Sequence, residues 1–193
     1  MEIGATKAVQ DRLKTTKIEE SKGASLVFCW DTHLTKIKGR NVLFIVNASN
    51  RYTIAMTDIE PRNWNYYAMY IRSVIHGVMQ EMGYSEEQIE QYFKMSGDTT
   101  ITKTHGRKSV GGINRMVMDA QYFGKKLEKE AKYQWELSEY LNRDICQPEG
   151  FDAYGYPNEL FKLDMERLGI ATKRKPAKVI DFAQYIENNR GTN

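Results

Sequence analysis

The segment at residues 103–114, KTHGRKSVGGIN, has the most unusual concentration of chemically useful residues in this sequence. It places four cationic or titratable side chains between an expected strand and the start of an expected helix, with two glycines in the first turn of that helix. The free N–H groups and the dipole of a helix N-terminus favour anions, and neighbouring Arg and Lys side chains reinforce this preference. We therefore predict either a site for a phosphate or an acidic partner, or a structural turn. The segment is not a Walker A loop, because Arg107 stands directly before Lys108, where that motif requires glycine.

His105 is the candidate catalytic residue of this segment. The pKa of a histidine can lie near 7, so its ring can act as a general acid or base on RNA. Lys103 and Arg107 would then stabilise the charge that develops on the phosphate. The interpretation that we prefer is a surface histidine without a catalytic role, because no second histidine lies near it in the sequence. We therefore expect a protein that is not an enzyme, with a ribonuclease-like enzyme as the alternative.

The other histidines and the two cysteines predict neither a metal site nor a cofactor. His33 follows Asp31 by two positions, on the same face of an expected strand, and His76 lies within an expected helix. Neither histidine is spaced from Cys29 or Cys146 as zinc ligands usually are. The two cysteines also lie far apart and suggest no disulfide framework, which is typical of a reduced, cytoplasmic protein.

Charge is segregated along the chain more than its formal net value of +3 indicates. Residues 99–126 carry six bases and one acid, whereas residues 127–170 carry ten acids and five bases. Such segregation predicts one surface that faces phosphates and another that faces proteins, or else two ordinary solvated faces. The candidate binding residues for a nucleic acid or a partner are Lys103, Arg107, Lys108, Arg115, Lys125, Lys126, Lys173, Arg174 and Lys175.

The elements that must position these residues follow from the period of the hydrophobic pattern. Expected strands cover residues 26–37, 42–46, 51–57 and 99–104, and expected helices cover residues 6–14, 67–82, 85–96, 109–146, 158–168 and 179–188. Short turns join the first three strands, which indicates an antiparallel meander, and the longest helix is expected to kink at Gly124. The predicted fold is α+β: a small antiparallel sheet of about four strands packed with helices, plus a C-terminal helical extension.

Several short motifs follow one another along the first two thirds of the chain. They are TK at residues 6–7, WDTHL at 30–34, LFIVN at 43–47, RY at 51–52, KT at 103–104 and RKSVGGIN at 107–114. In this order they resemble a family of small bacterial and phage domains of unknown function, over about residues 1–122. His33 stands where the family pattern has Asn, and Lys108 is inserted between its Arg and Ser. The resemblance implies an architecture rather than an activity, with a family domain at residues 1–122 and a helical extension at residues 123–193.

A domain of this kind with a charged helical tail is similar to phage-borne antagonists of host defence, anti-CRISPR proteins among them. This similarity implies an accessory protein of a mobile element that binds nucleic acid or a nucleic-acid-processing effector, most concretely an inhibitor of a Cas9-type nuclease. Another alternative is a homodimeric or larger structural protein, in which the helix at 109–146 pairs with its copy through Tyr133, Trp135 and Tyr140. No membrane partner is expected, because the longest apolar run is only Val42–Val46.

Overall fold

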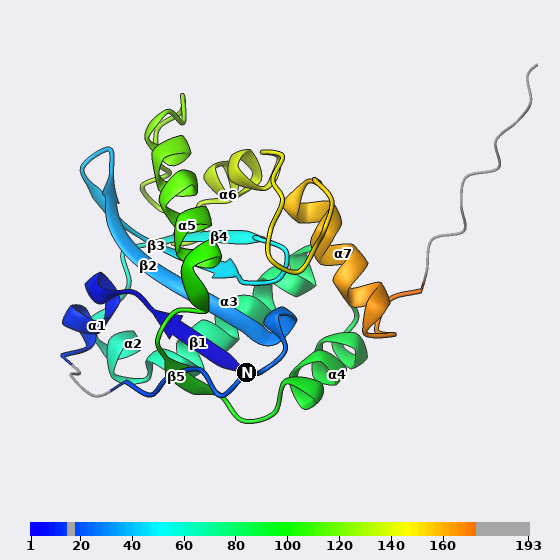
Figure 1. The fold of residues 1–193 in the computed structure, drawn as a ribbon. Helices are drawn as coiled ribbons and strands as arrows, with labels where there is room; N and C mark the ends of the chain where they lie inside the picture. The colour runs from blue at the N-terminus through cyan, green and yellow to red at the C-terminus, as the bar shows by residue number, and fades with distance from the viewer. Residues whose placement is uncertain (15–17, 173–193) are drawn as a thin grey trace, which may run out of the picture.

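The fold is α+β and is built on one five-stranded mixed sheet, in the order β4-β3-β2-β1-β5. The computed structural model describes residues 1–14 and 18–172 of the chain (Figure 1). The strands are β1 (Glu2–Ala5), β2 (Cys29–Ile37), β3 (Arg40–Asn47), β4 (Thr53–Thr57) and β5 (Thr100–Thr102). The strands β2, β3 and β4 form the expected antiparallel meander, whereas β1 lies parallel to both β2 and β5.

The prediction of about four antiparallel strands was therefore wrong in two respects. Strand β1 escaped prediction because its four residues, EIGA, combine a charged side chain and a glycine with only two apolar residues. Strand β5 was expected as a strand, but it pairs in parallel with β1, as in the register Ile3 to Ile101. Parallel neighbours need a long connection, and the chain between β1 and β5, which includes the antiparallel meander and the helices α2 to α4, supplies it.

The helices largely follow the predicted periodicity. They are α1 (Lys7–Leu13), the 3-10 turn η1 (Leu26–Phe28), α2 (Pro61–Asn65), α3 (Tyr67–Glu81), α4 (Glu86–Ser96), α5 (Gly106–Gln121), α6 (Trp135–Asn142) and α7 (Pro157–Arg167). The capping box that the sequence indicates at the start of α4 is present, because the Ser85 hydroxyl accepts from the Gln88 backbone N–H and the Gln88 side chain accepts from the Ser85 N–H.

Two hydrophobic cores lie on opposite faces of the sheet. On one face, strand residues such as Trp30 and Ile45 pack with α3, α4 and α7. On the other face, alternate residues such as Phe44 pack with α5 and α6. Figure 1 shows α5 crossing one face of the sheet while α3 lies behind it. Helix α5 thus lies directly over the strands that carry the polar residues described below.

The helix expected at 109–146 is divided into two. Helix α5 ends at Gln121, and α6 begins only at Trp135. The segment between them is held by the edge strand β4, because the Thr57 N–H donates to the Lys132 carbonyl and the Gln134 N–H donates to the Ala55 carbonyl. These hydrogen bonds pair backbone groups at an otherwise open strand edge. Their contribution outweighs the preference for a helix that the spacing of the apolar residues indicates. The single long helix on which the self-pairing hypothesis was built is therefore absent.

Residues from both sides of position 122 contribute to both cores. Phe161 and Met165 belong to the first core, and Leu137 and Leu141 belong to the second. The expected helix at 179–188 lies outside the described residues. Within residues 1–14 and 18–172, none of the helices is long and apolar enough to cross a membrane.

Candidate functional site

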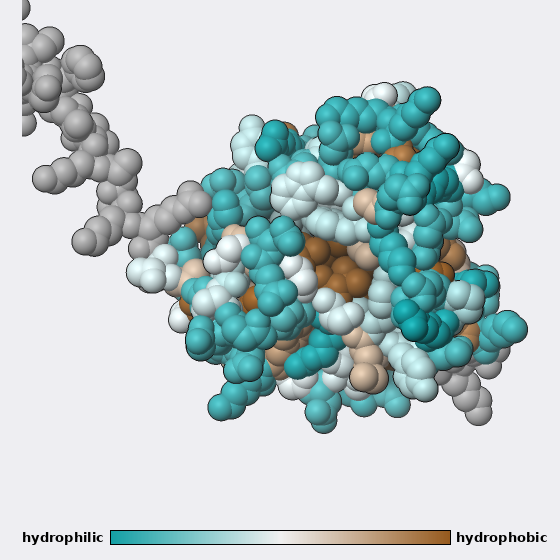
Figure 2. All heavy atoms as spheres, turned by 180° about the vertical axis from the view of Figure 1, so that it is seen from behind, coloured by the Kyte–Doolittle hydropathy of each residue, from teal (hydrophilic) through white to brown (hydrophobic). Residues whose placement is uncertain are grey.

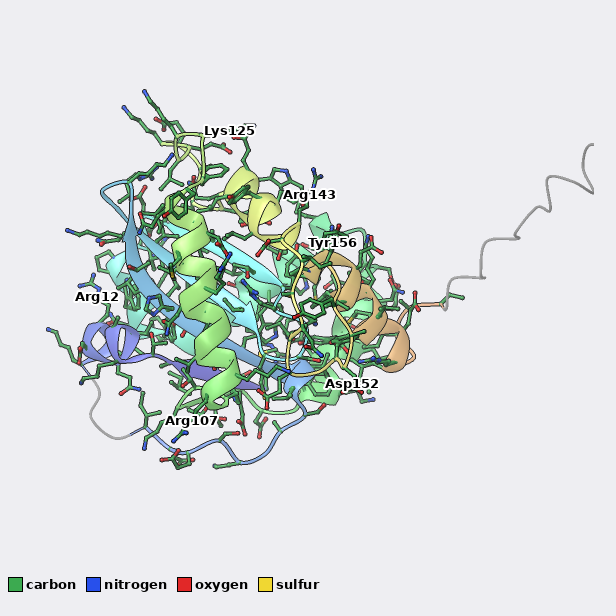
Figure 3. All side chains as sticks on the ribbon, turned by 45° about the horizontal axis from the view of Figure 1, so that its top comes forward. Arg12, Arg107, Lys125, Arg143, Asp152 and Tyr156 are labelled. Atoms are coloured by element: carbon green, nitrogen blue, oxygen red, sulfur yellow. The ribbon has the colours of Figure 1, made fainter. Side chains whose placement is uncertain are left out.

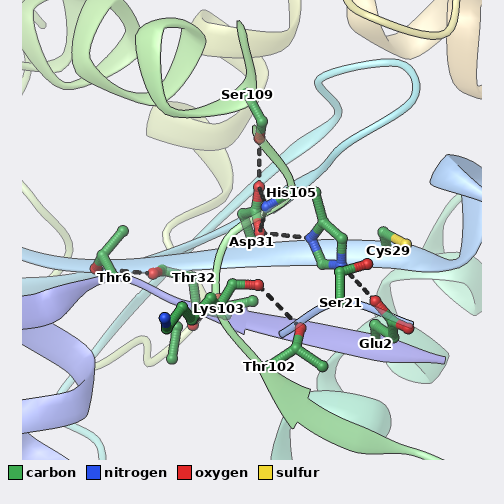
Figure 4. Close-up of polar contacts among 12 residues, drawn as sticks. Glu2, Thr6, Ser21, Cys29, Asp31, Thr32, Thr102, Lys103, His105 and Ser109 are labelled. Carbon is green, nitrogen blue, oxygen red and sulfur yellow. Dashed lines mark hydrogen bonds and ion pairs between the residues drawn. The ribbon is translucent and has the colours of Figure 1, made fainter. Parts of the chain in front are cut away.

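A cluster of buried polar side chains lies beneath the start of α5. Strand β1 contributes Glu2, strand β2 contributes Cys29 and Asp31, and the residue before α5 is His105 (Figure 4). Residues at alternate positions of a strand point to the same face, so Cys29 and Asp31 share the face that α5 covers. Each of the four residues is at least nine-tenths buried, with exposures from 0% for Cys29 and Asp31 to 7% for His105.

Both ring nitrogens of His105 are engaged by carboxylates. The Nδ1 atom lies 2.7 Å from Oδ1 of Asp31, and the Nε2 atom lies 3.0 Å from Oε2 of Glu2. The backbone N–H of His105 also donates to Asp31, at 3.2 Å, and the Ser109 hydroxyl donates to the other Asp31 oxygen. Asp31 is thereby fixed from two directions, and it fixes the orientation of the ring.

The surroundings of His105 keep its ring protonated at neutral pH. Burial alone lowers the pKa, but hydrogen bonds and charge from Asp31 and Cys29 act in the opposite direction and raise the pKa to about 10. For the Glu2 carboxyl, burial acts to raise the pKa. Hydrogen bonds from Ser21, the Lys22 backbone and His105 outweigh this effect, so the pKa of Glu2 is lowered overall. The pair is thus an imidazolium and a carboxylate, held by mutual hydrogen bonds in the interior.

Gly4 makes room for this arrangement. A Cβ atom at this position would lie 1.8 Å from Oδ1 of Asp31 and 3.0 Å from the Cα atom of Thr104. Only glycine therefore lets the Asp31 side chain and the segment before α5 approach β1 so closely. The chain then enters α5 through Gly106, whose φ of 90° is a conformation that other residues rarely adopt.

The residues expected to act together on RNA are not brought together. His105 is an interior residue rather than the surface residue that we expected. Lys103 forms an ion pair with Glu20, and Arg107 is exposed on the first turn of α5. In Figure 4 the Lys103 side chain points away from the His105 ring. This geometry does not present His105 to a polymeric substrate.

Glu2, Cys29 and His105 could hold a metal ion. One oxygen, the sulfur and one ring nitrogen of these residues lie within 4.8 Å of one another. The Cys29 thiol also donates to the Ser25 carbonyl at 3.4 Å. Sequence spacing could not reveal this set, because its members come from three separate segments of the chain and share no local motif.

The predicted basic residues follow α5 and its flanks instead of forming one compact cluster. Figure 3 shows Arg107 and Lys125 at opposite ends of the helix. Several of these bases have partners within the chain. Lys108 donates to the Pro148 carbonyl at 3.2 Å, Arg115 pairs with Asp119 at 3.1 Å, and Lys125 pairs with Glu136 at 2.5 Å. Arg107 and Lys126 form no ion pair within the part of the chain that the structure describes.

Two further lysines at this surface were not predicted. Lys36 and Lys38 belong to the β2–β3 hairpin and are exposed. The Lys38 ammonium donates to the backbone carbonyls of Phe123 and Lys125, the latter at 2.7 Å. The hairpin and the segment after α5 therefore meet at one end of the molecule. The predicted bases Lys173, Arg174 and Lys175 lie outside the described residues.

The face of the molecule that lies away from α5 provides a control position. Figure 2 shows that hydrophilic residues cover most of this face, around a small apolar hollow. Helix α4 contributes the exposed Lys94 to the layer on the far side of the sheet from α5. A lysine at that position offers a control for charge on the α5 side.

Comparison with known proteins identifies a family and no activity. A family model described as a domain of unknown function (DUF6933) matches residues 2–160. The match confirms the expected resemblance to a family of unknown function and extends it beyond residue 122, where it was expected to end. No curated protein and no solved structure matches the chain.

Proposed function

The chain belongs to the DUF6933 family of domains of unknown function, and we propose that it binds the phosphate backbone of a nucleic acid. The binding surface in this proposal is the outer face of α5 together with the lysines at its C-terminal end. In this proposal the chain binds without turnover, a view supported by the burial of His105, the histidine that an RNA-cleaving mechanism would use.

The distribution of charge on α5 is the observation that carries the proposal. Arg107, Lys108 and Arg115 are exposed on this helix, and its one acid, Asp119, has a side chain only 18% exposed. Asp119 lies between Arg115 and Arg51, at 3.1 Å and 4.0 Å, so both guanidinium groups compensate its charge. The outer face of α5 therefore presents positive charge without an exposed acid. Such a face attracts the phosphates of a nucleic acid.

The end of α5 extends this positive surface. Lys36 and Lys38 from the hairpin lie beside Lys125 and Lys126, because the Lys38 ammonium binds carbonyls of the segment after α5. The exposed Tyr122 stands next to these lysines at the end of the helix and offers a ring on which a base can stack. The 16 residues of α5 span about 24 Å, a length over which one strand of B-DNA carries about seven phosphates.

The most concrete form of the proposal is an accessory protein of a mobile element that inhibits a Cas9-type nuclease. Such effectors hold a guide–target heteroduplex and a displaced single strand in a positively charged channel. A second protein that binds exposed guide RNA or target DNA would compete with the effector for its phosphates. This form rests on the similarity in size and charge to phage-borne antagonists and predicts stoichiometric, salt-sensitive action.

The direct test is fluorescence anisotropy with a labelled single-stranded RNA and a labelled DNA duplex. The variant R107E/K126E reverses Arg107 and Lys126, two exposed bases of this surface that are among those without an ion pair in the described residues. We expect its affinity to fall by at least about tenfold. The slope of log affinity against log salt concentration should become shallower, by the contribution of roughly two phosphate contacts. The control K94E/K162E changes net charge equally on other helices and should bind as the wild type does. Equal binding by R107E/K126E and the wild type contradicts the proposal.

A cleavage assay tests the Cas9 form separately. The purified chain is mixed with a Cas9–guide complex and, in parallel, with guide RNA alone. Inhibition that saturates near one chain per complex, with intact RNA, supports the inhibitor. RNA shortened by substoichiometric protein supports the ribonuclease alternative instead. Unaffected cleavage excludes the inhibitor and leaves binding of the nucleic acid itself to the anisotropy experiment.

A further inference from the structure

We propose that Glu2, Cys29 and His105 form a zinc-binding site that joins β1, β2 and the start of α5. The proposal is independent of nucleic-acid binding, because it concerns interior residues rather than the outer face of α5. It rests on three observations: the convergence of the three side chains, the hydrogen bonds that orient them, and their burial.

The convergence is close to what a zinc ion requires. Zinc binds sulfur at about 2.3 Å and nitrogen or oxygen at about 2.0–2.2 Å, so tetrahedral geometry separates neighbouring ligand atoms by roughly 3.3–3.8 Å. The candidate atoms of Glu2, Cys29 and His105 all lie within 4.8 Å of one another, and the Glu2–His105 pair is 3.0 Å apart. Side-chain adjustments of about 1 Å are therefore enough to place all three around one ion.

Hydrogen bonds outside the ligand set already hold two of the ligands in the orientation that zinc needs. Asp31 accepts from Nδ1 of His105 at 2.7 Å, which turns Nε2 towards Glu2 and Cys29. A carboxylate behind a metal-binding histidine is the usual way in which proteins fix its tautomer and raise its basicity. The second oxygen of Glu2 accepts the Lys22 N–H at 2.8 Å, so the Oε2 atom remains directed at the cluster.

The identity of the ligands favours zinc over other common ions. Thiolate and imidazole are preferred by Zn²⁺, whereas Mg²⁺ and Ca²⁺ take oxygen ligands almost exclusively. One histidine, one cysteine and one carboxylate leave a fourth tetrahedral position for a water molecule or another small ligand. On binding, zinc replaces the protons on the Cys29 sulfur and on Nε2 of His105, and these protons are released to solvent.

Burial gives the site a structural consequence. The side chains of Glu2 and His105 are 5% and 3% exposed, and the Cys29 residue is fully buried. A bound ion would cross-link segments that are far apart in the sequence. Because the unfolded chain has no such preformed site, the free energy of binding adds to the free energy of unfolding.

The experiment uses the full chain, treated with a chelator and dialysed, and then titrated with Zn²⁺ or Co²⁺ alone. We expect one zinc ion per chain by calorimetry, a higher melting temperature with zinc, and a thiolate-to-cobalt charge-transfer band with Co²⁺. The other buried free cysteine, Cys146, provides the matched control, since C146S should keep the cobalt band and C29S should lose it. Removal of the outer partner in D31N should weaken zinc binding by about 10–100-fold.

Two outcomes would overturn the proposal. The first is a folded wild-type chain that shows no thiolate band when saturated with Co²⁺. The second is a band that disappears in C146S and persists in C29S, because the metal would then lie at Cys146. The test remains decisive if C29S does not fold, because the first outcome needs only the wild type, and loss of the band in a folded C146S chain already places the metal at Cys146.

Discussion

The two ends of α5 place their charged residues in different environments, one buried and one exposed. At its N-terminal end, Glu2, Asp31 and His105 are buried, and each is held by more than one hydrogen bond. At its C-terminal end, Lys125 and Lys126 are exposed, and Lys125 pairs with Glu136 across water-accessible space. The contrast indicates that the first end supports the fold, and we propose that the exposed second end contributes to binding of a nucleic acid.

The largest expected effect comes from breaking the buried end. Substitution of His105 by Ala leaves two buried carboxylates without their shared cation, and removal of one partner from such a pair usually costs about 3–5 kcal/mol. We expect a loss of that order in the free energy of unfolding at pH 7, measured by urea denaturation. The comparison is Lys125→Ala, which removes an exposed ion pair and should change stability by less than about 1 kcal/mol. Similar losses of unfolding free energy in the two variants would contradict the difference between the buried and the exposed end of α5.

Gly4→Ala tests the close approach of strand β1 to Asp31. The new methyl group would collide with a buried carboxylate and with the backbone at Thr104, so we expect destabilisation of about 1–3 kcal/mol or more. Gly111→Ala is the control, because a Cβ atom there meets nothing within 4 Å and alanine favours a helix. Thermal unfolding should show a lower melting temperature for Gly4→Ala and an equal or higher one for Gly111→Ala. A Gly4→Ala chain as stable as the wild type would contradict the geometry of the cluster.

The dependence of stability on pH provides a sharper test of His105. In the chelator-treated, metal-free chain its pKa is about 10 in the folded state and about 6.5 when unfolded, so the folded state binds the extra proton. The resulting stabilisation is fully present below about pH 6.5 and is lost as the pH rises towards 10. Between these limits the free energy of unfolding should fall by about 1.4 kcal/mol for each pH unit.

Two variants give the pH experiment its control. His105→Gln removes the titrating group and should flatten the profile in that window. His76→Gln removes a histidine that pairs with Glu86 at the surface and should leave the slope as in the wild type. A wild-type profile that is flat from pH 7 to 9 would show that His105 does not hold its proton as the cluster requires.

The smallest effect on stability is expected at the exposed end. Lys125→Ala/Lys126→Ala alters solvated side chains, and the free energy of unfolding should change by no more than about 0.5 kcal/mol for each substitution. The same variant should nevertheless bind nucleic acid more weakly, by anisotropy at low salt. Loss of stability beyond that of Gly4→Ala would mean that these lysines support the fold.

The residues at the two ends of α5 were predictable from the sequence to different degrees. Lys125 and Lys126 are neighbours in the sequence, so their clustering was visible, but Lys36 and Lys38 join them only because the hairpin folds against the end of α5. The buried cluster was not visible at all. Its members are separated by long stretches of chain. The strand that carries Glu2 also lacks the alternation of apolar and polar residues from which a strand can be predicted.

The same distinction holds for the fold. The long apolar runs in β3 and the helical spacing in α3 and α4 predicted those elements, because their local pattern matches their final environment. The segment at 122–134 was misjudged because its conformation is imposed by hydrogen bonds to the edge strand β4, including those of Gln134. Long-range backbone pairing leaves no local periodicity to detect.

The most direct test compares RNA binding by R107E/K126E and His105→Gln under one set of salt conditions, with folding of both verified by circular dichroism. We expect R107E/K126E to lose at least about tenfold in affinity and His105→Gln to bind RNA as the wild type does. A folded His105→Gln chain that no longer binds RNA, beside an R107E/K126E chain that still does, would contradict the account and place RNA recognition at the buried end of α5.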